Sequence, residues 1–152
     1  MAIRPGRRWL KRMLAIVLVI GCLAGFTAWR YWPWREKYAV PLPPPAATPG
    51  QVVVAYLRAL NALDQTTADA LSAPSEQATT ASWLHSTASI TSIRIASVQH
   101  FTGGEPYQVC MDFRYSSHWW LHDPSFPDGQ EYWCYYLSHR HDRWLIADDG
   151  LG

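Results

Sequence analysis

The chain has 152 residues, of which 49% are hydrophobic and 16% are charged, and its formal net charge is +1. This length suits one domain of ordinary size, and the composition excludes a disordered or collagen-like chain. The charge is divided unevenly, because residues 1–37 hold eight basic residues and one acid, whereas residues 38–152 hold five basic residues and eleven acids. Because an acidic domain repels phosphates, we expect no nucleic-acid partner.

The N-terminal segment has the pattern of a membrane anchor. Residues 1–12 form a basic tail, and residues 13–29 form an uncharged apolar run. At 1.5 Å per residue, this run makes about 25 Å of helix, which is just enough to cross a bilayer. Basic residues before such a helix favour a cytoplasmic N-terminus. We therefore expect a single-pass protein of the cell membrane whose C-terminal domain is extracytoplasmic.

Two alternatives share this topology. A cleaved secretory signal also begins with basic residues and continues with an apolar run, although no small-residue cleavage site precedes Arg30. The second alternative is a bacterial lipoprotein signal, in which Cys22 of the Val19-Ile20-Gly21-Cys22 sequence is lipidated. Against it, the residues after Cys22 stay apolar, so this cysteine is also compatible with a place inside a membrane helix. All three hypotheses export the rest of the chain.

Residues 30–47 are predicted to be a proline-rich linker, and residues 48–152 are predicted to form the extracytoplasmic domain. Five prolines fall within residues 38–49. Proline favours the extended polyproline II conformation, so this segment is predicted to be a semi-rigid spacer that lifts the domain off the membrane.

Helices are predicted at the start of the domain. Thr48 suits an N-cap, Pro49 suits the first helical position, and Gln51 completes a capping box. Apolar residues at helical spacing then indicate a helix over residues 49–64. Shorter helices are predicted over residues 66–71 and 75–86, the latter with Ser75 as its cap.

Strands are predicted in the second half of the domain, over residues 88–101, 107–118, 130–140 and 143–148. In the first of them the apolar phase slips between Ile90 and Ile93, which indicates a β-bulge. Residues 119–129 form a loop, and Asp148-Asp149-Gly150 has the composition of a turn that ends a strand. Helices followed by an antiparallel meander give an α+β fold, with about three helices packed on a curved four-stranded antiparallel sheet.

The domain resembles a known superfamily in a few motifs. These are Thr48-Pro49, Tyr56-Leu57, Leu60, and the Trp144-Leu145-Ile146 sequence near the end. Together with the order of elements, they resemble the nuclear-transport-factor-two-like (cystatin-like) superfamily, and in particular its small membrane-anchored or lipoprotein type in bacteria. The resemblance implies a cone-shaped domain in which the sheet wraps the first helix and leaves a pocket at the wide end. Members include enzymes, ligand binders and assembly domains, so the fold alone does not give the function.

Cys110 and Cys134 are predicted to form a disulfide bond. Paired positions of an antiparallel hairpin have a constant sum, and pairing these two cysteines centres the hairpin on residue 122, inside the predicted loop. Cross-strand neighbours lie close enough to bridge, and an exported domain meets a non-reducing environment. The alternative is a pair of buried free thiols.

The acidic residues and histidines give little indication of a metal site or of a catalytic site. Five histidines fall in the sheet half of the domain, but none has the spacing of a metal motif, so we expect no metal and no cofactor. Asp112, His139 and Asp148, together with the adjacent Asp149, are weak candidates for acid–base catalysis, because a pocketed cone brings sheet residues together. No nucleophile or phosphate-loop motif is present, so whether the protein is an enzyme stays open, with a non-catalytic role favoured.

Aromatic side chains are the most unusual feature, with eight of them in residues 119–144. Trp119, Trp120, Tyr132 and Tyr136 are candidates for a ligand or partner surface, because large exposed aromatic patches mark contacts. The alternative is that they fill the core. Our hypothesis is a non-catalytic interaction or assembly module at the bacterial cell envelope, with an envelope protein as partner. The alternative function is a small-molecule binder, or a lyase- or isomerase-type enzyme that uses the cone pocket.

Overall fold

The computed structural model describes residues 16–26, 36–101, 107–121 and 126–150. The chain divides into two units, Met1–Arg35 and Glu36–Gly152. In the first unit, a helix covers residues 16–26, which lie within the apolar run 13–29. None of the helices in these ranges has both the length and the apolar character that crossing a bilayer requires. The basic tail 1–12 lies outside the described residues.

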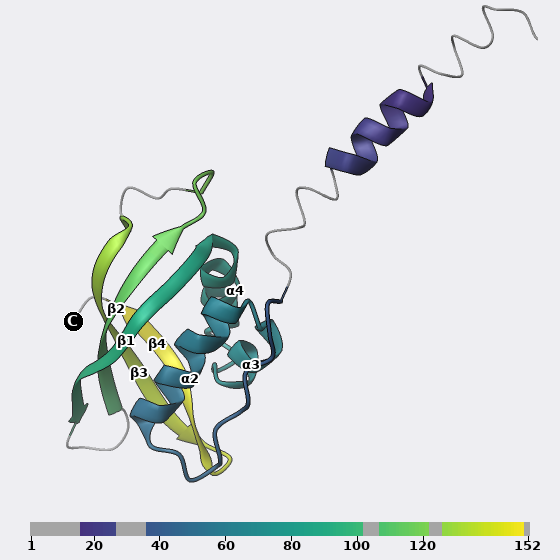
Figure 1. Ribbon diagram of the computed structural model, residues 1–152. Helices are drawn as coiled ribbons and strands as arrows, with labels where there is room; N and C mark the ends of the chain where they lie inside the picture. The colour runs from purple at the N-terminus through teal and green to yellow at the C-terminus, as the bar shows by residue number, and fades with distance from the viewer. Residues whose placement is uncertain (1–15, 27–35, 102–106, 122–125, 151–152) are drawn as a thin grey trace, which may run out of the picture. The chain divides into compact units, whose positions relative to one another are not determined.

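The second unit has the predicted α+β fold. Three helices, α2 (Pro49–Ala62), α3 (Gln65–Ala70) and α4 (Gln77–Ser86), precede four strands. The strands β1 (Thr87–His100), β2 (Tyr107–Ser117), β3 (Gly129–Arg140) and β4 (Arg143–Gly150) form one antiparallel sheet in the order β1-β2-β3-β4. Figure 1 shows the helices together on one side of this curved sheet. We call that side the inner face and the opposite side the outer face.

Helix α2 begins as its sequence predicts. The Thr48 side chain accepts a hydrogen bond from the Gln51 backbone N–H, and the Gln51 side chain accepts one from the Thr48 N–H, so the predicted capping box is confirmed. The helix ends at Leu63, which adopts a left-handed conformation. Near its start, Gly50 lies so close to β1 that an added Cβ would meet Ile95 Cδ1 at 2.8 Å. A larger residue at position 50 would therefore require the end of the Ile95 side chain to move, and Ile95 is 47% exposed.

Much of the proline-rich segment packs on the domain. Val40 and Ala47 are buried in the core, and the Val40 N–H donates to Asp64 Oδ2 at 2.8 Å. Asp64 also caps α3, because its Oδ1 accepts from the Thr67 N–H at 3.0 Å. From Glu36 onward, the segment predicted as a spacer thus belongs to the compact unit, and its residues 30–35 lie outside the described part.

Side chains of β2 alternate between the two faces of the sheet. Val109, Met111, Phe113 and Tyr115 are buried on the inner face of β2. The register of β1 against β2 shifts between Thr91 and Arg94, and Ser92 has a positive φ of 55°, so the predicted bulge is confirmed. Two details of the prediction are wrong. Helix α4 begins at Gln77 with Glu76 rather than Ser75 at its N-cap, and β4 continues through Gly150 instead of ending in a turn there.

The predicted disulfide bond between Cys110 and Cys134 is confirmed. The two residues are directly opposite in the β2–β3 register, with their Cα atoms 3.9 Å apart. Their side chains lie on the outer face, because the adjacent Trp133 and Tyr135 contact rings from the helices on the inner face.

Candidate functional site: an aromatic pocket between α4 and the sheet

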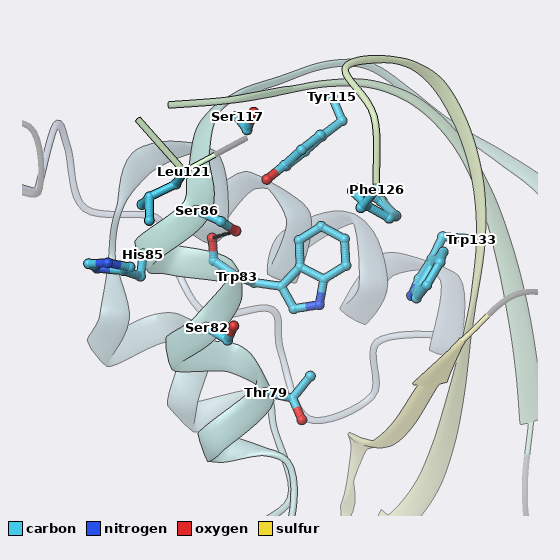
Figure 2. A pocket seen from close by; sticks show the side chains of 10 residues that line it. All are labelled: Thr79, Ser82, Trp83, His85, Ser86, Tyr115, Ser117, Leu121, Phe126 and Trp133. Atoms are coloured by element: carbon cyan, nitrogen blue, oxygen red, sulfur yellow. Dashed lines mark hydrogen bonds between the residues drawn. The ribbon is translucent and has the colours of Figure 1, made fainter. Parts of the chain in front are cut away.

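Buried hydroxyl groups fix the position of α4. The side chain of Thr80 is buried, and its Oγ1 lies 3.2 Å from the hydroxyl of Tyr56 on α2 and 2.9 Å from Ser72 Oγ. Ser72 Oγ in turn donates to the backbone oxygen of Ala68 at 2.9 Å. Because this network ties α4 to α2 and α3, the next turn of α4 projects Trp83 toward the sheet (Figure 2).

A cavity of about 390 Å³ lies between α4 and strands β2 and β3. Four aromatic rings form much of its wall: Trp83 from α4, Tyr115 from β2, Trp133 from β3 and Phe126 from the β2–β3 loop. The rings meet edge to face, with centroids 4.9 Å apart for Trp83 and Phe126 and 5.1 Å apart for Phe126 and Trp133. These contacts are favourable, so the wall is a packed aromatic surface with a fixed shape.

Polar groups complete the lining. They are supplied by α4 and by the end of β2, and Figure 2 shows them around the aromatic rings: Thr79, Ser82, His85, Ser86 and Ser117. Leu121, in the β2–β3 loop, also lines the cavity. An aromatic wall with a few hydroxyl groups is the lining typical of a small-molecule site rather than of a charged-substrate site.

Asp149 lies behind the aromatic wall. Its Oδ2 accepts a hydrogen bond from Trp83 Nε1 at 2.9 Å, and its partner across the sheet is Tyr135. Burial raises the pKa of Asp149, the indole N–H groups of Trp83 and Trp133 lower it, and Asp148 raises it, with a raised pKa as the net result. Trp133 Nε1 makes no hydrogen bond with any described residue. We therefore attribute the effect of Trp133 on the Asp149 pKa to the dipole of its indole N–H. Asp149 thus orients Trp83 and faces Trp133.

Two tyrosines lie beneath this carboxyl group. Tyr135 is fully buried, its ring meets that of Tyr56 edge to face at 5.8 Å, and its hydroxyl has no hydrogen-bond partner among the described residues. Burial raises the pKa values of both tyrosines, and the negative charge of Asp149 adds to the effect. Both hydroxyl groups therefore stay protonated over the whole physiological range, and neither is an ionised base.

The structure separates the predicted catalytic candidates. Asp112 pairs with Tyr132, and Asp148 pairs with Tyr136, so both acids lie on the outer face of the sheet, away from the pocket. His139 is at the far end of β3, where its ring contacts Trp144 at a centroid distance of 4.8 Å. Of the candidate acids considered from the sequence, Asp149 is the one that adjoins the pocket wall.

The predicted aromatic surface falls on two separate parts of the domain. Trp119 and Trp120 lie in the β2–β3 loop, where Trp119 is 78% exposed and Trp120 stacks on His118 with a centroid distance of 4.7 Å. Tyr132 and Tyr136 lie on the outer face, where they flank the disulfide bond, and the Tyr136 hydroxyl accepts from Gln108 Nε2 at 3.0 Å. In the described part of the chain, no group of three His, Cys, Asp or Glu side chains is arranged to hold a metal ion. His122 lies outside that part.

Sequence reasoning missed the contribution of α4 to the pocket. In the sequence, Trp83 is one apolar residue near the end of the short helix predicted over residues 75–86, and Thr79, Ser82 and Ser86 give no signal because serine and threonine are common in surface helices. The available signal was the spacing of residues 79, 82, 83 and 86, which lie on one helical face.

Comparisons with protein families, with curated proteins and with solved structures give no match for this chain.

Proposed function

We propose that this protein is a membrane-anchored, extracytoplasmic domain that binds a small, flat, apolar molecule in the aromatic pocket without transforming it. The observation that carries this proposal is the cavity of about 390 Å³ whose wall holds Trp83, Tyr115, Phe126 and Trp133. A filled core would favour the assembly role expected from the sequence, whereas an open aromatic cavity favours a ligand. The helices packed on a curved sheet also support membership of the nuclear-transport-factor-two-like superfamily as part of this proposal.

The lining sets the chemistry of the ligand. Stacked and edge-to-face contacts with four rings favour a planar conjugated or aromatic molecule, and the hydroxyl groups of Ser82, Ser86 and Ser117 suit one or two polar substituents at its edge. Binding is expected to be driven by removal of apolar surface from water. Catalysis is less well supported, because Asp149 lies behind the wall and directs Oδ2 to Trp83.

The membrane anchor and the export of the domain rest on the apolar run 13–29 and the basic residues before it. The disulfide bond between Cys110 and Cys134 is consistent with export, because such bonds persist in oxidising compartments. Proteolysis of intact spheroplasts tests this part of the proposal, since an exported domain is digested while cytosolic proteins survive.

Ligand binding is tested by thermal unfolding of the full chain in detergent micelles with 2-naphthol as the probe. Two substitutions on α4 form a matched pair: Ser82→Phe adds a ring at the pocket lining, and Ala81→Phe adds the same ring at an exposed position outside it. At ten times its dissociation constant, a ligand stabilises the folded state by about 1.4 kcal/mol. We expect this gain in the wild type and in Ala81→Phe, and its loss in Ser82→Phe. Equal gains in all three proteins would refute a pocket ligand.

A second candidate function is the envelope assembly role, and the 78% exposure of Trp119 favours it. An indole so exposed is a common contact residue of protein interfaces. Crosslinking in intact cells tests this role, because a discrete adduct that disappears in Trp119→Ala would identify a protein partner at this loop.

A further inference from the structure

The chain joins the second unit at a defined place. The Lys37 backbone N–H donates to the Ala62 oxygen at 2.7 Å. Its Nζ donates to the backbone oxygens of Asn61 at 2.8 Å and Ala88 at 3.1 Å. These three bonds fix Lys37 at the end of α2 and the start of β1. The attachment point of the N-terminal segment is therefore held at one end of the domain.

The most exposed tryptophan of the described residues lies at that same end. The His118 N–H donates to the backbone oxygen of Ser86, next to the start of β1, at 3.0 Å, and Trp119 and Trp120 follow directly. The pKa of His118 is lowered first by its burial and then by interaction with Lys37 and His85. The two indoles thus follow a residue bonded to Ser86, two residues before Ala88, which accepts from Lys37 Nζ.

The tether to the predicted anchor is short. Trp29 ends the apolar run, and Lys37 follows eight residues later, so the chain between them reaches at most about 28 Å whatever its conformation. A domain of this size has a radius of gyration of about 13 Å and hence a diameter of roughly 35 Å. Tyr31, Trp32 and Trp34 in the tether are themselves residues that favour the membrane–water interface. With residues 13–29 as the proposed anchor, Lys37 lies within about 28 Å of the end of that anchor.

We infer that this end docks on the outer surface of the membrane, with Trp119 and Trp120 in the interfacial layer of the lipids. Tryptophan prefers this layer because its ring is apolar and its N–H is polar. Lys37 adds attraction to anionic headgroups. Two acids described near this end are Glu36, which precedes Lys37 in the chain, and Asp128. Asp128 accepts hydrogen bonds from the Ser117 N–H at 2.7 Å and from the Ser117 hydroxyl at 2.8 Å.

Docking in this orientation also indicates where the pocket ligand comes from. This part of the inference rests on the proposed function. Ser117 and Leu121 flank the two indoles in the chain, and both line the aromatic pocket, as do His85 and Ser86 from the same end (Figure 2). The pocket rim then faces the lipid. The ligand class that fits is a lipid-soluble amphiphile with a planar ring, which enters from the bilayer rather than from water.

The test uses the full chain in vesicles of phosphatidylethanolamine and phosphatidylglycerol, with an environment-sensitive fluorophore on a single thiol. Three label positions are compared. The native Cys22, the free cysteine of the chain, reports on the anchor. In a Cys22→Ser background, Trp119→Cys reports on the proposed interface, and Tyr132→Cys reports on the outer face, where Tyr132 is 45% exposed. Lipids with nitroxide groups in the upper acyl chain act as quenchers.

We expect strong quenching from Cys22 and from position 119, with at least a twofold larger effect at position 119 than at position 132. Quenching at Cys22 with none at position 119 would overturn the docked orientation and leave the anchor standing. An aqueous label at Cys22 would instead overturn the anchor and the orientation together. Emission at position 119 that shifts with protein density, without lipid quenching, would assign this surface to a second copy and would also overturn the inference.

Discussion

On the inner face of the sheet, Trp133 and Tyr135 pack against α4 and α2, whereas on the outer face Tyr132 and Tyr136 flank a disulfide bond. These aromatic residues alternate along one strand, so their identities alone do not distinguish the faces. The helices make the difference, because they remove the inner rings from water and hold them at fixed angles. An aromatic side chain therefore forms a specific cavity only where a second layer covers it, and on the outer face it stays partly solvated.

Removing the disulfide bond tests how much the outer face contributes to stability. In Cys110→Ala/Cys134→Ala, the unfolded chain regains the freedom of a loop of 24 residues. We expect a loss of about 3 kcal/mol in the free energy of unfolding on the chain-entropy estimate. Urea unfolding with and without reductant measures it. The double variant should be insensitive to reductant, and a loss in the wild type under reductant of less than half this size would contradict the assignment.

Asp149 gives the next largest effect, on the inner face. Asp149→Leu leaves Trp83 Nε1 without its acceptor in a partly buried place, which costs about 1–3 kcal/mol. Asp149→Asn retains an oxygen acceptor and is expected to cost less than about 1 kcal/mol at neutral pH. Urea unfolding at pH 7 separates the two variants. Equal losses would show that the hydrogen bond to Trp83 does not hold the pocket wall.

Wild type and Asp149→Asn are expected to differ in how their stability depends on pH. Because burial raises the pKa of Asp149 in the folded state, its contribution to stability is fully present below the ordinary carboxyl pKa and is lost as the pH rises through the raised value. The free energy of unfolding of the wild type should therefore fall relative to that of Asp149→Asn between those two pH values. Outside that interval the difference between the two proteins should be constant. Burial raises the pKa of Glu76, and the charge of Asp149 raises it further. This second contribution is absent from Asp149→Asn, so the difference between the two proteins includes the coupling between the two carboxyl groups.

The smallest effect is expected at Tyr132 on the outer face. This side chain is partly exposed and is placed across the strands from Asp112, so Tyr132→Ala should change the free energy of unfolding by less than about 0.5 kcal/mol and leave 2-naphthol binding unchanged. Calorimetry of the full chain measures both quantities. A large loss of probe affinity would mean that the outer face also contributes to the ligand site.

Local patterns carried much of the fold. The capping box at Thr48, the bulge after Ile90 and the pairing of Cys110 with Cys134 were all predicted from sequence, because each depends on neighbours a few residues away or on the constant register of one hairpin. The alternation along β2 identified its inner face for the same reason.

Tertiary structure alone decided the site. Asp149 adjoins Trp83 although 66 residues separate them, and α4 faces the sheet because Thr80 is bonded to Tyr56 and Ser72. The hydrogen bond from the Val40 N–H to Asp64 and the burial of Val40 likewise make part of the predicted spacer a part of the folded domain. Such contacts are not encoded in local propensity or period, since they depend on which faces of separate elements meet when the core closes. The amino-acid pattern determined the elements, and their packing determined which side chains enclose the cavity.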